Sequence, residues 1–298
     1  MSSSQLLASL PTAWEVYEHT GGIWLSTGCP ELDRGLGGGI PFCPITEICG
    51  EAGVGKSQLL LKLALTAQLP VGQGGLGGSS VIISTEGRVP VQRLKDYLHS
   101  CPSLQQLKTA NNSSSDGGGG DDGDDDEEIL RRVLLDDQIS DSDSLWVALR
   151  ERLPAALENN RAIRLVIIDS ITSVFRGEFL DRSHKTMMER NDWFFGLSGY
   201  MKQMHDAFGC MFVLANQVTT DLAVGKTKPA LGLVWSHCVN QRFMLEFAQQ
   251  EHGEETGQQQ QRRRSLGVEF SPNLPCGLVT DRLVVGSFGL RVDKLRVI

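Results

Sequence analysis

The sequence lacks several features that would place it in common protein classes. It has no apolar run long enough to cross a membrane, and its first residues lack the basic start and apolar stretch of a secretion signal. Its seven cysteines include no C-x-x-C pair, and its six histidines are scattered without metal-ligand spacing. We therefore expect a soluble, intracellular protein with reduced thiols, no zinc site and no membrane partner.

An excess of basic charge is also absent, because the formal net charge is −8. Such acidity would ordinarily argue against a nucleic-acid partner. However, residues 111–128 contain eight Asp or Glu and no Lys or Arg, so the rest of the chain is neutral. The acidity belongs to one segment, and a DNA partner stays open.

Two segments have almost no apolar side chains to bury, at about 111–128 and 249–264. We expect both to be disordered, solvated insertions at the surface. The 298 residues otherwise suit one large α/β domain, which we place at residues 24–298. Residues 1–23 are expected to form an N-terminal lead that docks on a partner.

The remaining chain alternates between short apolar strands and helical segments. The pattern predicts strands at 45–49, 80–84, 132–135, 164–169 and 210–215, and helices at 58–68, 91–100, 143–157 and 188–208, with Ser142 capping the third helix. The strand at 164–169 is apolar throughout, which suits a parallel sheet covered on both faces. Shorter alternating strands follow at 242–247, 265–270 and 278–285. The predicted fold class is α/β, with a mostly parallel central sheet, an antiparallel C-terminal extension and helices on both faces.

Between the first predicted strand and helix lies the sequence GEAGVGKS, a complete G-x-x-x-x-G-K-[ST] phosphate-binding loop. Its glycines allow the backbone N–H groups to turn inward at a helix N-terminus. Lys56 is expected to reach the β and γ phosphates, and Ser57 to be the first ligand of Mg²⁺. The predicted nucleotide-binding residues are Gly50, Glu51, Ala52, Gly53, Val54, Gly55, Lys56, Ser57 and Gln58.

Three more polar residues end predicted strands at the edge where open α/β sheets bind ligands. Asp169 is the expected second carboxylate for Mg²⁺, and Glu86 could accept the proton of an attacking water. Gln217 could contact the γ-phosphate. An unrelated phosphate-loop kinase is disfavoured, because no acceptor pocket or Arg-rich lid follows the first two strands.

The motifs GEAGVGKS, STEG (84–87), LVIIDS (165–170) and LANQV (214–218) occur in the order found in RecA-type recombinases of archaea and eukaryotes, and the chain resembles that family. The resemblance implies a RecA-like P-loop ATPase core with ATP and Mg²⁺ as cofactors. It also implies catalytic roles for Lys56, Glu86 and Gln217, and metal ligation by Ser57 and Asp169. Arg93 matches the arginine that stacks on adenine.

Segments at 175–179, 231–235, 239–242 and 271–275 look most like the eukaryotic recombinase paralogues, although features of two different paralogues are present. The resemblance implies a nuclear, weak DNA-dependent ATPase that acts in homologous-recombination repair of double-strand breaks. Its expected partners are another recombinase paralogue, the main recombinase, and single-stranded or branched DNA, on which it would promote or stabilise recombinase filaments. The alternative is a structural adaptor in which ATP only stabilises the fold.

The sequence departs from the strand-exchange enzymes in three respects. We expect no helical DNA-binding domain before Trp24, so DNA contacts would come from loops at about 176–190 and 218–229, with Arg176, Arg182, Lys185, Arg190, Lys226 and Lys228. Residues 10–13 read Leu-Pro-Thr-Ala where the family has a Phe-x-x-Ala interface motif that adds a strand to the neighbouring subunit. Phe270 replaces an Asp beside the segment 271–275, which resembles the cap over a neighbour's ATP.

Overall fold

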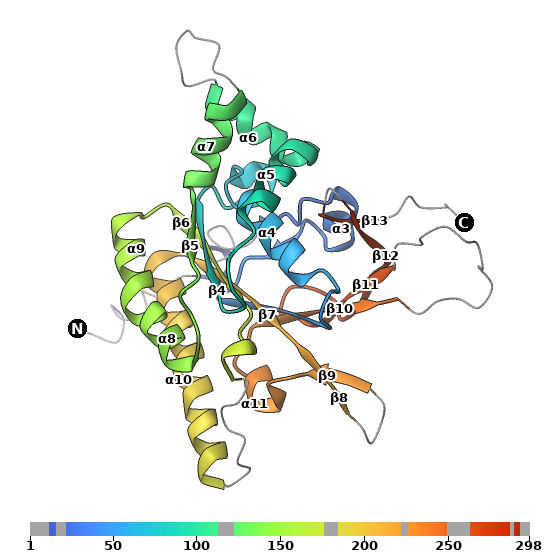
Figure 1. Ribbon diagram of the computed structural model, residues 1–298. Coiled ribbons are helices and arrows are strands. Elements are labelled where there is room, and N and C mark those ends of the chain that lie inside the picture. Colours follow the sequence, from blue (N-terminus) through green and yellow to red (C-terminus); the bar gives the residue numbers. More distant parts are fainter. Residues whose placement is uncertain are drawn as a thin grey trace, which may run out of the picture.

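The computed structural model describes residues 12–15, 22–112, 122–175, 184–221, 226–248, 263–286 and 289–292 (Figure 1). Its centre is a nine-stranded sheet with the strand order β13-β12-β11-β10-β3-β7-β6-β4-β5. The bounds are β3 Ile45–Gly50, β4 Ser79–Ser84, β5 Val133–Asp136, β6 Ile163–Asp169, β7 Met211–Asn216, β10 Gln241–Phe247, β11 Arg264–Phe270, β12 Gly277–Gly286 and β13 Gly289–Val292. All the predicted strands are present, and each bound lies within one residue of the predicted one.

The sheet is parallel from β10 through β3, β7, β6 and β4 to β5. The strands from β10 to β13 pair in antiparallel fashion. This arrangement confirms the predicted fold class. The carboxyl ends of the parallel strands share one edge, so residues that end different strands are brought together there.

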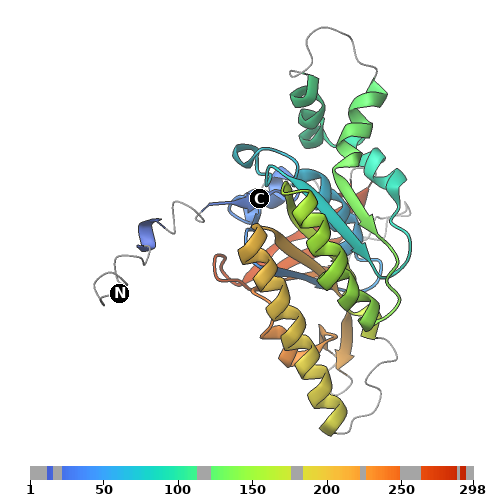
Figure 2. The same cartoon turned by 90° about the vertical axis from the view of Figure 1, so that its left-hand side faces the viewer.

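Helices cover both faces of the sheet, as Figures 1 and 2 show. Along β6, Leu165 and Ile167 belong to a core shared with α4 and α5, while Val166 and Ile168 belong to a core shared with α8, α9 and α10. This alternation follows from the two-residue period of a strand. The bounds are α3 Pro30–Gly35, α4 Lys56–Thr66, α5 Val91–Ser100, α6 Pro102–Asn112, α7 Asp122–Arg131, α8 Ser142–Val147, α9 Leu153–Asn159, α10 His184–Phe208 and α11 Gly232–Ser236.

The predicted helix at 143–157 is interrupted. Asp141, and not Ser142, is its N-cap, because the Asp141 carboxylate accepts a hydrogen bond from the Ser144 N–H at 2.7 Å. A π-helical segment, Ala148–Arg152, separates α8 from α9. Pro154 explains the interruption, since a proline has no N–H for the fourth preceding carbonyl and its ring crowds that carbonyl.

The expectation of disorder throughout 111–128 is wrong for its last part, which belongs to α7. Two ion pairs with i, i+4 spacing, Glu127 with Arg131 and Glu128 with Arg132, stabilise the helix. Asp126 is buried and lies 2.8 Å from His99 of α5, which ties α7 to the domain. The helix dipole also stabilises negatively charged side chains near the N-terminus of a helix. The other predicted insertion lies outside the described residues except for residues 263 and 264, and Arg264 begins β11.

Smaller elements complete the fold. They are the two-stranded pairs β1 (Trp24–Leu25) with β2 (Ile40–Pro41) and β8 (Val218–Asp221) with β9 (Lys226–Pro229), and the 3-10 turns Val71–Gln73 and Ser173–Phe175. The β8–β9 hairpin starts directly after Gln217 and lies beside α11 (Figure 1). Within the described part of the chain, no helix combines the length and the apolar character needed to cross a membrane.

Candidate nucleotide-binding site

The phosphate-binding loop connects β3 to α4, which begins at Lys56. Gly53 and Gly55 have positive φ angles of 74° and 114°, which glycine adopts without steric cost. Gly50 passes so close to β10 that an added Cβ would lie 2.2 Å from the Leu245 carbonyl oxygen. The loop therefore needs glycine for two reasons, the turn itself and its tight packing on the next strand.

A cavity of about 390 Å³ opens beside this loop. It is lined by Ala52, Gly53, Gly55, Lys56, Ser57, Gln58, Glu86, Asp169, Ser170, Gln217 and Val285. Six of these residues are among the predicted nucleotide-binding residues 50–58, and three come from the predicted strand ends. The loop residues Gly50, Glu51 and Val54 do not line the cavity, and Val54 is fully buried in the core.

Lys56 is a buried residue that lines the cavity. Its Nζ donates hydrogen bonds to the carbonyl oxygens of Gly50 at 2.7 Å and Glu51 at 2.8 Å. Burial lowers the pKa of this amine, while the carboxylates of Asp169 and Glu86 act in the opposite direction. A lysine whose charge is costly to bury gains from the approach of an anion, so its environment suits a phosphate group.

Asp169 ends β6 and also lines the cavity. Burial raises the pKa of its carboxyl group, and Glu86 raises it further, while a hydrogen bond with Ser57 and the charge of Lys56 lower it. The Ser57 hydroxyl and the Asp169 carboxylate are thus adjacent oxygen donors, the type that Mg²⁺ prefers. No cluster of three or more His, Cys, Asp or Glu suited to a metal occurs in the described ranges, so the remaining Mg²⁺ ligands would be water and phosphate oxygens.

Glu86, Ser170 and Gln217 also line the cavity and contact one another. One carboxylate oxygen of Glu86 accepts a hydrogen bond from the Ser170 hydroxyl at 2.8 Å and from the Gln217 side-chain amide at 2.9 Å. These residues follow three different strands, β4, β6 and β7. The structure brings Glu86 and Gln217 into contact, whereas the sequence could only place them at separate strand ends. Glu86 remains exposed to the cavity.

Arg93 of α5 lies beside the cavity but is not part of its lining. Its Nε donates to the Gln58 side-chain oxygen at 2.8 Å, and its Nη2 donates to the Gly286 carbonyl oxygen at 2.7 Å. The guanidinium also lies 4.6 Å from the centre of the Tyr97 ring. In this arrangement Arg93 joins the loop helix to the end of β12, where Val285 contributes to the cavity wall.

Sequence reasoning missed two cavity residues. Ser170 could have been found, because it directly follows Asp169 and carries a hydroxyl. Val285 has no such signal, because β12 is more than 200 residues from the loop and reaches the cavity only through the antiparallel end of the sheet.

A second, apolar cavity of about 290 Å³ lies at the β5 edge of the sheet. Its walls include Val81, Leu134, Leu135, Leu153 and Arg152. The Leu135 residue is 43% exposed beside it. An exposed apolar side chain on an edge strand is a surface to which another strand can add.

The remaining predicted interface residues are only partly covered by the structure. Leu10, Pro11, Arg176 and Arg182 lie outside the described residues. Lys185 and Arg190 are on α10, and Lys226 and Lys228 are in β9. Phe270 ends β11, where the Arg242 guanidinium lies 5.1 Å from its ring centre.

Comparison with known proteins adds an independent line of evidence. The family model described as Rad51 matches residues 20–112 and 128–258, and the gap falls in the acidic insertion. The DNA repair protein XRCC3 homolog of Arabidopsis thaliana is 30% identical over 282 residues, covering 84% of this chain and 88% of that protein. DNA repair protein XRCC3 of Bos taurus is 33% identical over 258 residues, covering 84% and 70%. DNA repair protein RAD51 homolog 2 of Mus musculus is 29% identical over 259 residues, covering 78% and 69%.

These matches confirm the predicted resemblance to RecA-type recombinase paralogues. They span the loop between β3 and α4, the strand ends that carry Glu86, Asp169 and Gln217, and the core on both faces of the sheet. The chain therefore belongs to the Rad51 family.

Proposed function

We propose that the protein binds ATP with Mg²⁺ and hydrolyses it slowly in response to DNA, as a recombinase paralogue in homologous-recombination repair in the nucleus. The observation that carries this proposal is the contact between Glu86 and Gln217 in the cavity that Lys56 also lines. A site that only held phosphate would need the loop and Lys56, but no exposed carboxylate held by an amide. That carboxylate gives the site a candidate base for water.

Each residue has a distinct proposed role. The loop N–H groups and Lys56 bind the phosphates, and Ser57 with Asp169 would hold Mg²⁺, which neutralises charge on the transferred phosphoryl group. Glu86 accepts a proton from water, and Gln217 orients Glu86. Because Gln217 directly precedes the β8–β9 hairpin, its position could respond to DNA bound at that hairpin.

We also propose that the protein works in a complex with another recombinase paralogue and contacts the main recombinase on single-stranded or branched DNA. The β5 edge supports this proposal, because its apolar cavity and exposed Leu135 suit an added strand from a neighbouring subunit. Residues 10–13 would supply the corresponding segment to another subunit. The names of the relatives support the repair role, since they are called DNA repair proteins.

Glu86→Gln tests the enzymatic part of the proposal. The amide removes the proton acceptor and keeps the shape, so we expect ATP affinity to stay within about twofold while DNA-stimulated hydrolysis falls about 100-fold. Asp136→Asn is the matched control, because Asp136 also ends a parallel strand but does not line this cavity. Its carboxylate accepts a hydrogen bond from the Arg152 Nε at 2.8 Å. Equal hydrolysis by wild type and Glu86→Gln would overturn the assignment of Glu86.

One observation favours a second function, that of a structural adaptor in which ATP only stabilises the fold. Phe270 stands where strand-exchange enzymes have an aspartate, and the Arg242 guanidinium lies over its ring. No carboxylate is then available at that position for a neighbour's nucleotide. Full repair by Glu86→Gln in cells lacking the protein, together with failure of Lys56→Ala, would identify the adaptor.

A further inference from the structure

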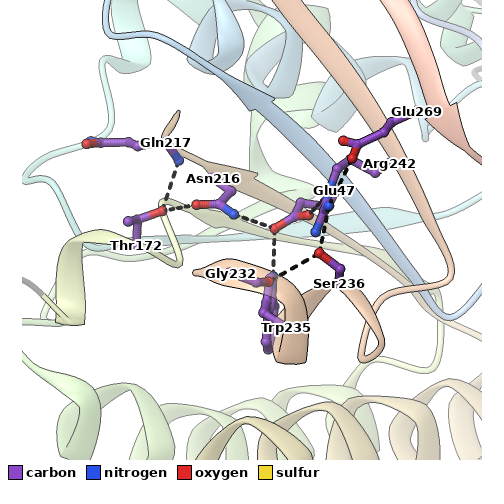
Figure 3. A network of polar contacts seen from close by, with 9 residues as sticks. All are labelled: Glu47, Thr172, Asn216, Gln217, Gly232, Trp235, Ser236, Arg242 and Glu269. Carbon is purple, nitrogen blue, oxygen red and sulfur yellow. Dashed lines mark hydrogen bonds and ion pairs between the residues drawn. The ribbon is translucent and has the colours of Figure 1, made fainter. Parts of the chain in front are cut away.

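A buried ion pair lies behind the nucleotide cavity, between neighbouring strands of the sheet. Glu47 of β3 and Arg242 of β10 are register partners, and their side chains contact each other (Figure 3). Their exposed fractions are 0% and 1%. The Arg242 Nε donates to one carboxylate oxygen of Glu47. An isolated charge at this depth would be very unfavourable, so the pair requires further partners.

Those partners are polar groups from two separated parts of the chain. The second carboxylate oxygen of Glu47 accepts a hydrogen bond from the Asn216 amide at 2.7 Å and from the Trp235 indole at 2.6 Å. The Arg242 Nη1 donates to the Ser236 hydroxyl at 2.9 Å, and it lies 3.5 Å from Glu269. Figure 3 shows that Glu47 lies at the centre of this network.

The charge of Glu47 sets the direction of a hydrogen-bond chain that ends at Gln217. An ionised carboxylate can only accept, so Asn216 must present its NH₂ group to Glu47 and its oxygen to Thr172. The Thr172 hydroxyl then donates to Asn216, and its oxygen accepts the Gln217 backbone N–H at 2.9 Å. The Gln217 side chain in turn donates to Glu86.

The same pair also holds the far end of the following segment. Asn216 stands at the start of the segment 216–236, and Trp235 and Ser236 stand at its end, in α11. Between them is the β8–β9 hairpin, which forms a separate two-stranded sheet. The residues before β8 and after β9 connect it to the central sheet. The Glu47 carboxylate and the Arg242 guanidinium therefore hold both ends of this segment, and Gln217 is its second residue.

We propose that the Glu47–Arg242 pair is a positioning unit, which orients Gln217 toward Glu86 and anchors both ends of the segment 216–236. Neither residue touches the cavity, so the pair acts through Asn216 and Thr172. The effect on hydrolysis rests on the proposed ATPase function. The effect on the Gln217 backbone does not depend on that function.

Hydrogen exchange of the Gln217 amide, measured at single-residue resolution in the full chain, tests the proposal directly. Glu47→Gln allows the Asn216 amide to turn either way, and we expect the Gln217 amide to exchange about tenfold faster, as for the loss of one buried hydrogen bond. Thr172→Val breaks the chain without altering the ion pair, and should give the same increase. Asp281→Asn, an exposed change on β12, is the control. Unchanged exchange at Gln217 in Thr172→Val would overturn the proposal, even if Glu47→Gln unfolds.

A kinetic cycle separates positioning from general weakening of the structure. Glu47→Gln should lower kcat for ATP about tenfold and leave the Kd for ATP within about twofold. Combined with Gln217→Ala, it should slow hydrolysis no further than Gln217→Ala alone, because both changes act through one side chain. Additive effects would overturn the proposal. A wild-type protein that hydrolyses no ATP would refute the proposed function, while the exchange experiment would still decide the positioning role.

Discussion

Two polar clusters of opposite behaviour meet at the peptide bond between Asn216 and Gln217. The open cluster, Lys56, Glu86, Asp169 and Gln217, lines the nucleotide cavity. The closed cluster, Glu47, Asn216, Trp235 and Arg242, is buried, and the last three bond to Glu47, although the Arg242 Nη2 has no hydrogen-bond partner among the described residues. Both contain a cation, carboxylate and amide, so residue type does not distinguish them.

The pKa shifts of the charged groups differ between the two clusters. In the open cluster, burial lowers the pKa of Lys56 and raises that of Asp169, so both charged forms are disfavoured before a ligand binds. In the closed cluster, burial acts against the Arg242 charge, but the opposing charge of Glu47, with smaller contributions from Cys49 and Glu269, raises the pKa of Arg242 overall. In the closed cluster the partner charge more than offsets the cost of burial, whereas the buried charges of the open cluster stay disfavoured and gain from a ligand.

The largest expected effect comes from removing one member of the closed pair. Arg242→Met leaves the Glu47 charge buried without its cation, and we expect it to lower the free energy of unfolding by about 3–5 kcal/mol. The double variant Glu47→Gln, Arg242→Met should recover most of that loss, since the introduced side-chain amide is neutral and its oxygen can still accept hydrogen bonds from Asn216 and Trp235. Urea unfolding measures both. Wild-type stability in Arg242→Met would contradict the distinction between the clusters.

The next effect belongs to the open cluster and concerns binding. Lys56→Ala should weaken ATP binding at least about 100-fold, or about 2.7 kcal/mol, with little change in the stability of the free chain. Fluorescence titration with an ATP analogue measures the affinity. Lys62→Met is a matched control, because Lys62 is a buried lysine of the same helix that does not line the cavity. Equal loss of affinity in both variants would show that the effect is structural.

Adjacent residues at the end of β7 provide a sharper comparison. Asn216→Ala removes one hydrogen-bond partner from the buried carboxylate of Glu47 and one from the Thr172 hydroxyl, and we expect a loss of about 1–3 kcal/mol in stability. Gln217→Ala should change stability by less than about 0.5 kcal/mol, because its side chain is accessible in the cavity. Chemical denaturation of the two variants side by side checks the order, and equal losses would refute it.

The smallest effect is a pH dependence at Asp169. A raised folded-state pKa means that this carboxyl group favours folding in its protonated form, and that this contribution is lost as the pH rises through the raised pKa. Asp169→Asn should therefore melt a few degrees higher than wild type at pH 7 without ligand, and the difference should vanish below the ordinary pKa of about 3.9. A higher melting temperature for wild type at pH 7 would contradict the sign.

Much of the open cluster could be predicted from the sequence, because its members follow recognisable local signals. The phosphate-binding loop is continuous, and Glu86, Asp169 and Gln217 each follow a short apolar strand whose carboxyl end lies at one edge of the sheet. The closed cluster gave no such signal. Glu47 lies in the middle of an apolar strand, and its partner Arg242 is 195 residues away.

The incorrect predictions have local causes. The α7 helix was missed because its acidic composition suggests disorder, while its stability comes from two i, i+4 pairs and from Asp126 packed against His99. The cap at Asp141 was placed one residue too late, since Asp141 and Ser142 are both good capping residues and only backbone geometry separates them.

The sequence by itself determined the fold class, the phosphate-binding loop and the order of the strand-end residues, because these depend on periodicity and on contiguous motifs. Only the tertiary structure decided which polar residues are enclosed in the core and which line a cavity open to a ligand. That outcome depends on strand order, which places β10 beside β3 and brings Arg242 onto Glu47. The same order leaves Lys56 and Glu86 facing a cavity, with partners that a ligand can replace.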